Sequence, residues 1–572
     1  MSIATDLKPI WNIADRGYQE EQLLVDELGI SSVAATLLVQ RGYSEPRDAE
    51  KFLNPEIEHL RQPTDLPDCE AALRRILLAK ERNERIYVHG DYDVDGVSSA
   101  ALLTRFLRLI GCDVVAHVPH RESEGFGIHD KAVQWAKESG AGLFLTCDCG
   151  TSANEQIDAV YELGMEAVIT DHHQPPPILP RAHAIVNPHR KDVLSPCTEL
   201  SGAGVVFKLC AAIASELGMP VDKYYRAFFD LAVLGTVADV MPLIDDNRVI
   251  ARHGLIELRR TKKPGLQALL EVSDLSDPTR MLTTRHIGFQ LGPRINAVGR
   301  IDDAGIALKM LLANELDEAR THARFLNEKN QERRTLQDQV AEQVFAEIKQ
   351  RDLSNQYVIV VAQESLPKGI VGIVAGKVVD HFRRPAFVLT INDGVASGSA
   401  RSLPGFNLAD AIEELDVSGG GHAMAAGVSL PAKDVEEFAF AIDNYAKTVL
   451  TPDAFRPSID IDVEVSMEEA GAQAASDLRK LEPFGESNPS PIFLCRNVTL
   501  VSAMPTKKPE HVRLTLGQGH DVRQAMGFGM GDRISQVRVG EALDVVFELE
   551  ESEWNGQRRV QWILRDFQPK SS

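Results

Sequence analysis

Short apolar runs alternate with amphipathic stretches along the chain from Arg85 onward. The runs VVAHVP, LFLTC, EAVIT and AIVNP are separated by segments such as NEQIDAVYELG, whose apolar positions have helical spacing. This alternation is typical of βαβ units around a mostly parallel sheet. A second region of the same kind contains YVIVVA and PAFVLT. We therefore predict an α/β protein with two successive α/β domains, over residues 61–314 and 353–452.

Three further segments complete the predicted organisation. Residues 1–60 form an N-terminal helical segment. In residues 315–352, Leu336, Val340 and Val344 recur every four positions on a highly charged segment, which predicts a long connecting helix. Residues 453–572 alternate apolar and polar positions with period two and contain an Asn-Gly turn signal, which predicts an antiparallel OB-like β-barrel.

The composition restricts the classes of function that the chain can have. Its 572 residues carry a net charge of -22, which argues against a simple basic protein that coats nucleic acid. Acidic substrates stay compatible if local basic clefts or bound metals reverse the field. The seven cysteines form no C-x-x-C pair, and the first residues lack a basic region followed by an apolar run. Since no apolar run approaches the roughly 18 residues of a membrane helix, we expect a cytoplasmic protein without membrane association.

The stretch RIYVHGDYDVDGVSSAALL places Asp91, Asp93 and Asp95 on alternate positions between a β-branched run and a glycine. The spelling D-x-D-x-D-G also begins the EF-hand calcium loop, which follows a helix and ends with a glutamate at position 12. Counting from Asp91, that position is Leu102, and residues 85–89 have the pattern of a buried strand. We therefore expect a turn between a strand and a helix, where open α/β sheets bind ligands. Solvated turn aspartates remain the alternative interpretation.

Three other segments place acids or imidazoles where we expect strands to end. LFLTCDCG supplies Asp148, AVITDHHQPPP supplies Asp171, His172 and His173, and LAVLGTVADVMPL supplies Asp239. Each residue alone has an ordinary structural interpretation, as a turn residue, a satisfied polar group or a helix cap. Because a parallel sheet gathers its strand ends along one crevice, we expect these side chains to meet there. Oxygen and imidazole ligands without thiolates suit Mn²⁺ or Mg²⁺ better than zinc.

Four motifs, HGDYDVDG, CDCG, ITDHH and ADVMPL, occur in this order and resemble those of the DHH phosphoesterase superfamily. SGGGHAMAAG resembles the glycine-rich motif of the DHH-associated domain of that superfamily. The strings LSGAGVVFKL, LGPRINAVGR, LEPFGESNPSP and EWNGQRRVQWILRDF are similar to those of its bacterial single-strand-specific exonucleases. The resemblance covers nearly the whole chain, with LPKGIVGIVAGK and GSARS as mild variants of the usual spelling.

The resemblance implies a phosphodiesterase that uses two Mn²⁺ or Mg²⁺ ions and hydrolyses single-stranded DNA from its 5′ end to mononucleotides, in DNA repair and recombination. By motif, the implied metal ligands are His89, Asp93, Asp95, Asp148, His172 and Asp239. Asp148 would bridge the two ions, with Asp93 and His89 beside it at one ion and the remaining ligands at the other. Asp91 and His173 would be the catalytic residues that ligate or orient water.

Basic and glycine-rich segments supply the candidates for substrate binding. They are a phosphate clamp of Arg294, Asn296 and Arg300, an anion-binding nest of Gly419, Gly420 and Gly421 with His422, and the terminal-phosphate candidates Arg121, Ser399 and Arg401. Ordinary surface cations and a flexible glycine turn are the alternative interpretations. The OB-like barrel would hold single strands by stacking and charge, with Phe484, Phe528 and Trp554 as candidates, although most aromatics in a small barrel belong to its core.

Two other functions stay open at this point. One is a DHH phosphoesterase of short oligonucleotides, pyrophosphate or cyclic dinucleotides, since fold and metal site do not by themselves determine the substrate. The other is a catalytically inactive DHH scaffold, against which the complete set of acidic positions argues. For the exonuclease we expect a monomer whose partners are single-stranded DNA, the single-stranded DNA-binding protein that covers it, and a repair helicase.

Overall fold

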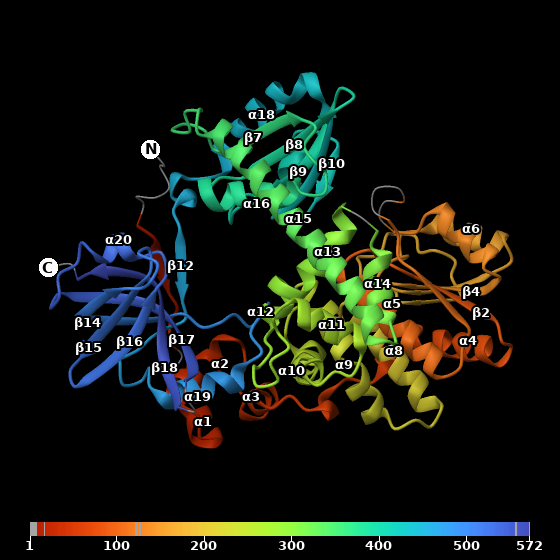
Figure 1. Cartoon of the computed structure of the whole chain (residues 1–572), viewed down its shortest axis with the longest axis horizontal. Helices are drawn as coiled ribbons and strands as arrows, with labels where there is room; N and C mark the ends of the chain where they lie inside the picture. The colour runs from red at the N-terminus through yellow and green to blue at the C-terminus, as the bar shows by residue number, and fades with distance from the viewer. Residues whose placement is uncertain are drawn as a thin grey trace. The chain divides into compact units, whose positions relative to one another are not determined.

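The computed structural model of the chain describes residues 8–16, 18–120, 124, 127–301, 303–554 and 557–570, without the side chains of residues 18, 300, 301, 551–554 and 557–559 (Figure 1). The chain divides into two compact units. One consists of Met1–Asn12 and Glu328–Ile459, and the other of Ile13–Asn327 and Asp460–Ser572. In the described ranges, no helix is long and apolar enough to cross a membrane.

The predicted parallel sheet is confirmed in the larger unit. Five strands lie in the order β3-β2-β4-β5-β6, and every neighbouring pair is parallel. Their bounds are β2 Arg85–Gly90, β3 Val114–His117, β4 Ala141–Cys147, β5 Glu166–Thr170 and β6 Ala184–Val186. Alternate residues of each strand face opposite sides, so that Ile86 and Tyr87 belong to two different hydrophobic cores. A sheet buried on both faces explains why its strands are continuous apolar runs.

Helices cover both faces of this sheet (Figure 1). One face packs against α4 Cys69–Glu81, α5 Val94–Leu109 and α8 Gly202–Glu216, and the other against α6 Asp130–Glu138 and α7 Asn154–Glu162. Further helices extend the first core: α9 Val221–Ala238, α10 Asp245–Arg259, α11 Pro264–Val272, α12 Thr284–His286, α13 Gly292–Ile301 and α14 Gly305–Leu312, with a π-helical turn η3 at Ile287–Leu291. The 3-10 turns η1 Ile57–His59 and η2 Pro63–Asp65 precede α4.

One expected strand is a helix. The run LAVLGTVA is the last part of α9, and Asp239 is the C-cap of this helix rather than a residue at a strand end. Residues 228–236 of α9 are buried without interruption, so the helix is buried all round at this point. A short apolar run of this kind cannot be distinguished from a buried strand by its periodicity.

The long connecting helix is confirmed as α15, Leu316–Ile348. Its first half contributes Ala319 and Ala323 to the core around α5. Its second half contributes Val344 and Ile348 to the core of the other unit. The four-residue spacing in the sequence therefore marks the face of α15 that packs in the second core.

The smaller unit contains the second α/β domain. Its five-stranded sheet has the order β10-β11-β9-β8-β7, in which only β7 and β8 are parallel. The strands are β7 Ile359–Glu364, β8 Ala386–Asn392, β9 Val395–Arg401, β10 Gly419–Gly421 and β11 Ala425–Pro431. The helices are α16 Val371–Phe382, α17 Leu408–Glu414 and α18 Val435–Val449, with the 3-10 turns η4 Ala432–Asp434 and η5 Pro452–Phe455. Helix α16 packs against β8 and β9.

The C-terminal barrel is confirmed, and the N-terminal helices belong to it. Its strands lie in the order β13-β14-β15-β16-β18-β17, and an additional pairing of β14 with β17 closes the barrel. They are β13 Val463–Glu464, β14 Phe493–Pro505, β15 Val512–Gln518, β16 Asp521–Gly527, β17 Ala542–Trp554 and β18 Gln557–Pro569, with α20 at Gly531–Ile534. One hydrophobic core joins them to α1 Tyr18–Leu28, α2 Ser32–Gln40, α3 Pro46–Leu53 and α19 Ala472–Leu481. Strands β1 Ile10–Ile13 and β12 Ser458–Ile461 form a separate two-stranded sheet.

Candidate metal centre

The three aspartates after β2 are held in different ways. Asp93 is the N-cap of α5, and its Oδ1 accepts a hydrogen bond of 3.0 Å from the Gly96 N–H. Asp95 lies in the first turn of the same helix and is buried, as is Asp91. The alternative of solvated turn aspartates is therefore wrong for Asp91 and Asp95.

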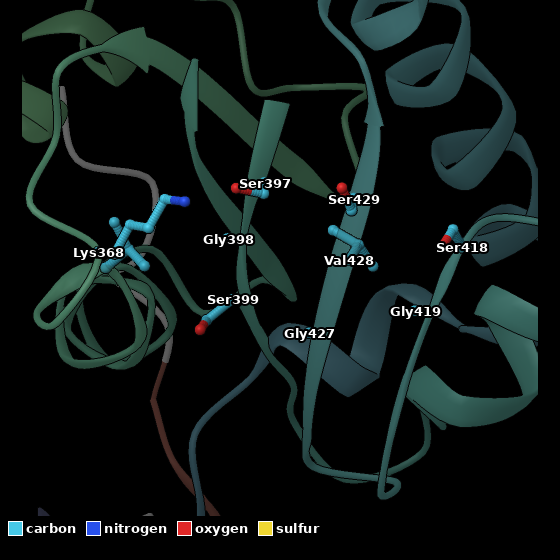
Figure 2. Close-up of a pocket in the computed structure, with 10 residues that line it drawn as sticks. Lys368, Ser397, Gly398, Ser399, Ser418, Gly419, Gly427, Val428 and Ser429 are labelled. Carbon is cyan, nitrogen blue, oxygen red and sulfur yellow. The ribbon is translucent and has the colours of Figure 1, made fainter. Parts of the chain in front are cut away.

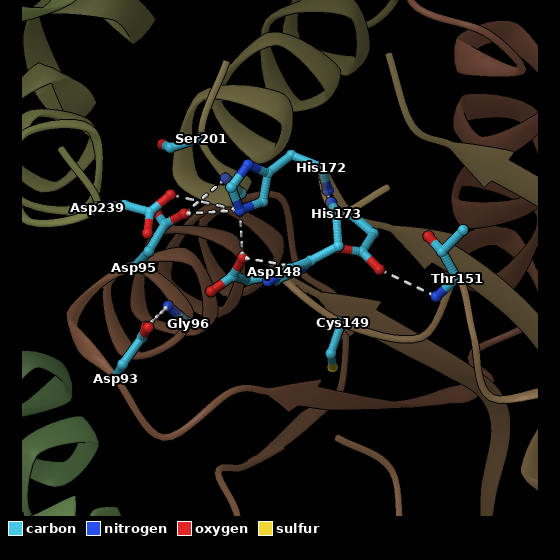
Figure 3. A network of polar contacts seen from close by, with 12 residues as sticks. Asp93, Asp95, Gly96, Asp148, Cys149, Thr151, His172, His173, Ser201 and Asp239 are labelled. Atoms are coloured by element: carbon cyan, nitrogen blue, oxygen red, sulfur yellow. Dashed lines mark hydrogen bonds and ion pairs between the residues drawn. The ribbon is translucent and has the colours of Figure 1, made fainter. Parts of the chain in front are cut away.

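The remaining acids and imidazoles approach Asp95 from other elements (Figure 3). His172 follows β5, and its Nε2 lies 3.1 Å from Asp148 Oδ1, 3.8 Å from Asp95 Oδ2 and 3.5 Å from Asp239 Oδ2. Asp148 follows β4 in a left-handed conformation with φ 62°, which turns its carboxylate into this cluster. Carboxylates from the end of β4, the first turn of α5 and the C-terminus of α9 thus surround a single imidazole nitrogen.

Three groups of side chains in the described residues have ligand atoms within 4.8 Å of one another, close enough to share a metal ion. They are Asp91 with Asp93 and Asp148, Asp95 with His172 and Asp239, and Asp148 with His172 and His173. Asp148 is common to two groups and His172 is common to two groups. The arrangement can hold two neighbouring cations with Asp148 between them.

Main-chain groups and glycines fix the position of these carboxylates. Asp95 accepts hydrogen bonds of 2.6 Å from the Gly202 N–H and 2.9 Å from the Ala203 N–H, both at the start of α8. A Cβ atom on Gly202 would lie 2.6 Å from the Cβ of Asp148, and one on Gly235 would lie 2.1 Å from Oδ1 of Asp95. Backbone therefore packs directly against both carboxylates, and no larger residue fits at either glycine.

Asp171 is a site residue to which the sequence assigned no role. Its Oδ1 accepts a 2.8 Å hydrogen bond from Nδ1 of His173, and its Oδ2 accepts a 3.0 Å bond from the Thr151 N–H. Asn187 donates to the Thr151 hydroxyl and to the His173 carbonyl. The first letter of the D-H-H spelling was the available signal, and the hydrogen bonds show that this aspartate orients the second histidine.

Burial and mutual repulsion raise the pKa of the clustered carboxyls. Burial, followed by the charges of neighbouring aspartates, raises the pKa of Asp95 and Asp148 well above the usual range, and that of Asp91 and Asp239 to about 7. The cluster therefore resists full ionisation until a cation compensates its charge.

The two histidines are affected in opposite directions. Burial lowers the pKa of His172 to about 4, so its ring is neutral at physiological pH. The hydrogen bond to Asp171 raises the pKa of His173 to about 9, so this half-exposed ring is cationic. For Asp171, burial opposes ionisation, but the hydrogen bonds from His173 and Thr151 outweigh it and lower the pKa to about 2. A neutral imidazole suits a metal ligand, and a cationic one suits contact with phosphate.

The donor set fits Mn²⁺ or Mg²⁺. Oδ1 of Asp91 and Oδ1 of Asp148 are buried and accept no hydrogen bond from the described residues. His172 is hydrogen-bonded to the backbone of Leu200, as is common for a ring whose other nitrogen ligates a metal. The adjacent thiols are turned elsewhere, because the sulfurs of Cys147 and Cys149 lie 3.7 and 3.8 Å from the His89 carbonyl. Carboxylate and imidazole ligands without thiolate favour a hard cation.

His89 has one buried nitrogen, Nδ1, without a hydrogen-bond partner among the described residues. Its ring is fully buried and stacks on Phe144, and its Nε2 lies 3.2 Å from the Gly127 carbonyl. His89 belongs to none of the three groups of described residues whose ligand atoms are close enough to share a metal ion. Burial lowers the pKa of His89 to about 3, so this ring is neutral.

The candidates for substrate binding in the larger unit have different positions. Arg294 donates to the Asn327 side chain and to the carbonyls of Gln290 and Val272, so its guanidinium links α13 to neighbouring segments. Asn296 is half-buried on the same helix. Arg121 and the side chain of Arg300 lie outside the described residues.

In the smaller unit, Ser399 and Arg401 lie on the same face of β9. A Cβ atom on Gly372 would be 3.2 Å from the Ser399 Oγ and 3.1 Å from a guanidinium nitrogen of Arg401, so the two polar groups lie side by side. Residues 419–421 do not form the expected nest, because they are the extended strand β10 paired with β11. His422 follows this strand and is exposed.

The aromatic candidates of the barrel also differ in exposure. Phe528 is 56% exposed and makes an edge contact with His511 at 5.2 Å between ring centroids. Phe484 is partly buried against the barrel core, with Arg41 6.0 Å from the centre of its ring. The side chain of Trp554 lies outside the described residues.

Comparison with known families accounts for most of the chain. The N-terminal domain of the DHH family matches residues 85–236, the DHHA1 domain matches residues 355–448, and the RecJ OB domain matches residues 461–566. These matches cover the sheet with the carboxylate cluster, the second α/β domain and the barrel.

Individual proteins match over nearly the full length. The single-stranded-DNA-specific exonuclease RecJ of Bacillus subtilis is 35% identical over 97% of this chain and 70% of its own length. RecJ of Salmonella typhimurium is 31% identical over 93% of this chain and 95% of its own length. The crystal structure of RecJ from Thermus thermophilus in complex with Mn²⁺ superimposes with a TM-score of 0.83 at 26% identity, over 98% of this chain and 80% of that one. A structure of the same protein with Mg²⁺ gives a TM-score of 0.76 at 25% identity, over 98% and 79% of the two chains. The chain described here belongs to the RecJ family.

Proposed function

We propose that this chain is an exonuclease that hydrolyses single-stranded DNA from the 5′ end to mononucleotides, in DNA repair and recombination. The observation that carries the proposal is the cluster of Asp91, Asp93, Asp95, Asp148, His172 and Asp239, in which all but Asp93 and Asp239 are buried and two carboxylate oxygens accept no hydrogen bond from the described residues. The names of the relatives supply the substrate class. A buried charged cluster of this size also argues against an inactive scaffold, because its repulsion has no structural benefit without a cation.

Each residue of the cluster has a role in the proposed reaction. Two bound Mn²⁺ or Mg²⁺ ions would supply an activated water and compensate charge on the attacking and leaving oxygens. Asp148 would be the shared ligand, with Asp91 and Asp93 on one side and the group of Asp95 on the other. Asp91 has a place in this group by its position, and His89 stays a candidate ligand of the same ion, because its Nδ1 is buried without a hydrogen-bond partner among the described residues while its Nε2 faces the Gly127 carbonyl.

His173 would act on the scissile phosphate itself. Its ring is held by Asp171, is cationic near neutral pH and is 45% exposed, so it can reach a ligand. A cationic imidazole can donate a hydrogen bond to a phosphate oxygen and stabilise the charge that develops there. Asp171 would be a positioning residue, since its contacts are with His173, His172 and Thr151.

The terminal phosphate of the strand would be bound by Ser399 and Arg401 in the DHHA1 domain. Recognition of a 5′-phosphate in every cycle requires that each cut leaves a new 5′-phosphate on the shortened strand. Water would therefore add to the phosphorus, and the bond from phosphorus to the 3′-oxygen of the released nucleotide would break. The released product is a nucleoside 5′-monophosphate with a free 3′-hydroxyl.

End-labelled single strands test the proposed activity and its direction. With Mn²⁺ present, a 5′-label should appear at once as a mononucleotide, whereas a 3′-label should pass through progressively shorter strands. EDTA and the Asp148→Asn variant should stop both reactions, and a blunt duplex should be resistant. Release of the 3′-label first would refute the direction. Hydrolysis confined to dinucleotides would favour the short-oligonucleotide phosphodiesterase instead.

A single substitution tests the terminal-phosphate pocket. A charge-assisted hydrogen bond to phosphate contributes roughly 1.5 to 3 kcal/mol, which corresponds to about a tenfold to hundredfold effect. Arg401→Ala should lower kcat/KM by that factor on 5′-phosphorylated strands and much less on 5′-hydroxyl strands. Arg383→Ala, in the same unit, is the control for the loss of a cation. An equal loss on both substrates would make Arg401 a general backbone contact.

Partners and location form the last part of the proposal. The chain has a net charge of -22, so we propose that the single-stranded DNA-binding protein on the substrate helps to recruit it, with a repair helicase supplying unwound strands. We also propose a cytoplasmic location, which the seven unpaired cysteines support. A pull-down with purified single-stranded DNA-binding protein tests the first partner, and absence of association would remove it.

A further inference from the structure

A wide-open cavity of about 370 Å³ lies in the surface of the DHHA1 domain, between the beginning of α16 and one face of strands β9, β11 and β10 (Figure 2). Its polar side chains are Lys368, Ser397, Ser399, Ser418 and Ser429, and most of the remaining lining is glycine backbone. The cavity continues from Ser399, one of the two residues proposed above to bind the terminal phosphate, toward the other end of β9. The proposed hydrolysis assigns no ligand to the part of the cavity beyond Ser399.

The strand register builds this cavity from two rows. Ser397 lies opposite Ser429 across β9 and β11, and the N–H of Ser429 donates to the Ser418 carbonyl at 2.8 Å. Cross-strand partners face the same side of a sheet, so these hydroxyls form a row. In the next row, Ser399 lies opposite Gly427, and Gly427 lies opposite Gly420. A Cβ atom on Gly427 would meet only the Gly398 carbonyl, at 3.7 Å, so the space above this row is open.

The polar groups of the cavity are available to a ligand. Within the part of the chain that the structure describes, no hydrogen bond or ion pair engages the four hydroxyls or the Lys368 ammonium group. No acidic side chain lines the cavity. Figure 2 shows Lys368 on one side, with its nitrogen directed toward the strand that carries Ser397. Val371, the first residue of the 12-residue helix α16, lines the cavity as well, and the positive end of the helix dipole adds to the field of the lysine.

These groups suit phosphate rather than a nucleobase. Hydroxyl and ammonium donors around one anion are typical of phosphate sites, and the glycines of the paired strands leave room for the anion beside these donors. A base would require an aromatic ring for stacking or an amide or carboxylate for its edge, and the lining of this cavity has none of these. The volume is at the lower end of the range for ligand sites, about 300 to 1,000 Å³, and exceeds the space that one phosphate requires.

We propose that this cavity binds the additional phosphates of a 5′-di- or triphosphorylated strand end. The inference rests on the proposed function, in which Ser399 and Arg401 hold the first phosphate. Residues two apart on a strand are about 6.6 Å apart, so phosphates that extend the end beyond Ser399 reach the row of Ser397 and Lys368. The enzyme would therefore accept the 5′-triphosphate of an unprocessed strand end.

The accepted triphosphate predicts a specific first product. Water adds to the scissile phosphorus and the bond to the 3′-oxygen breaks, as for a monophosphorylated end, while the phosphoanhydride bonds stay intact. The first nucleotide is therefore released as a nucleoside 5′-triphosphate with a free 3′-hydroxyl. Every later nucleotide is released as a monophosphate, because each cut leaves a single 5′-phosphate on the strand.

The test compares strands of one sequence that carry a 5′-triphosphate, a 5′-monophosphate or a 5′-hydroxyl, with products separated by ion-exchange chromatography. The full-length protein should release nucleoside triphosphate first from the triphosphorylated strand, at a rate within a few-fold of that on the monophosphorylated strand. Strong inhibition by the 5′-triphosphate, or release of pyrophosphate, would overturn the proposal.

Substitution of Lys368 identifies the cavity as the site. Lys368→Ala should lower kcat/KM on the triphosphorylated strand by roughly tenfold, the effect of one charge-assisted hydrogen bond, and leave the monophosphorylated strand unchanged. Lys368→Arg should restore most of the loss. Lys433→Ala, which removes an exposed lysine from η4, should affect neither substrate. An equal loss on both strands would make Lys368 a general contact and would overturn the proposal. Ser429→Ala is a second variant, which should likewise lower kcat/KM on the triphosphorylated strand and leave the monophosphorylated strand unchanged.

A binding measurement separates this inference from the proposed function. Inorganic tripolyphosphate should bind the metal-free protein in calorimetry, and Lys368→Ala should weaken this binding by about tenfold. If no single strand is hydrolysed, the proposed function fails and the phosphate site is judged by this binding alone. If tripolyphosphate does not bind and triphosphorylated ends are rejected, the cavity inference fails and the exonuclease remains. If a free nucleoside triphosphate binds at least as tightly as a triphosphorylated strand end, the cavity is a site for free nucleotides. This result would also overturn the strand-end proposal.

Discussion

The metal centre and the cavity of the DHHA1 domain both offer polar groups without protein partners, but they differ in burial and charge. Asp91 and Asp148 are almost completely buried, whereas the serines of the cavity are half-buried or exposed. Burying a charge without a counter-charge is costly, whereas an exposed hydroxyl can exchange its ligand for water at little cost. The difference teaches that the first site requires its cations, and that the second binds its ligand only when a suitable strand end is present.

The largest expected effect concerns the ligand shared by the two metal groups. Asp148→Asn should reduce hydrolysis by more than the roughly 100-fold that loss of an outer-shell partner costs, because neither ion is then properly held. Without metal, the Asp148→Asn protein should melt at the same or a higher temperature than the wild type, because burial raises the pKa of Asp148 and the amide stays neutral in the cluster without binding a proton. Asp158→Asn, at an exposed ion pair with Arg181, is the control. Near-normal turnover would show that Asp148 is not a shared ligand.

The next effect tests whether packed glycines make the metal centre rigid. Gly235→Ala would place a Cβ atom 2.1 Å from Asp95 Oδ1 and should displace this carboxylate. Since a displacement of about 1 Å at a reacting centre can cost roughly 100-fold, turnover should fall by about that factor and Mn²⁺ affinity should fall too. Gly376→Ala in α16 has no atom within 4 Å of its new Cβ and should leave activity intact. Equal activity of the two variants would contradict a rigid centre.

A smaller effect concerns the orientation of His173. Asp171→Asn removes the negative charge that holds its ring and should lower activity by about tenfold to a hundredfold. The lowered pKa of His173 should appear as an NMR titration of its ring nearer to neutral pH than in the wild type. A merely structural role of Asp171 would lower stability and leave this titration unchanged.

The smallest effect is a pH-dependent stabilisation by metal. The folded pKa of Asp91 and Asp239 is raised from 3.8 to about 7, so the metal-free folded state retains protons that the unfolded state releases. Its stability should therefore fall as pH rises from 3.8 to about 7. Mn²⁺ relieves the repulsion, so the gain in Tm on adding Mn²⁺ should be larger near pH 8 than near pH 5. A gain independent of pH would mean that the carboxyls ionise without the metal.

Much of this architecture follows from local patterns in the sequence. Continuous apolar runs predicted the parallel strands, and a four-residue spacing predicted α15, because each pattern reflects which side of one element is buried. The motif order also placed Asp148 and His172 at strand ends, where the fold of a parallel sheet brings them together. These predictions need no knowledge of distant contacts.

Local patterns failed where one spelling is compatible with two structures. The run before Asp239 is apolar on all sides, so its helical character depends on packing against α5, α8 and α10. The glycines at 419–421 suit a nest or a strand, and pairing with β11 selects the strand.

The sequence by itself determined the classes of element, the order of the domains and the residues that supply carboxylates and imidazoles to one crevice. Only the tertiary structure decided that the N-terminal helices share a core with the barrel, that Asp171 orients His173, and that serines from β9 and β11 form one row with Lys368 beside it. The physical reason is that periodicity records which face of an element is buried. It does not record which distant element packs against that face, and the contacts and pockets of the folded chain depend on this packing.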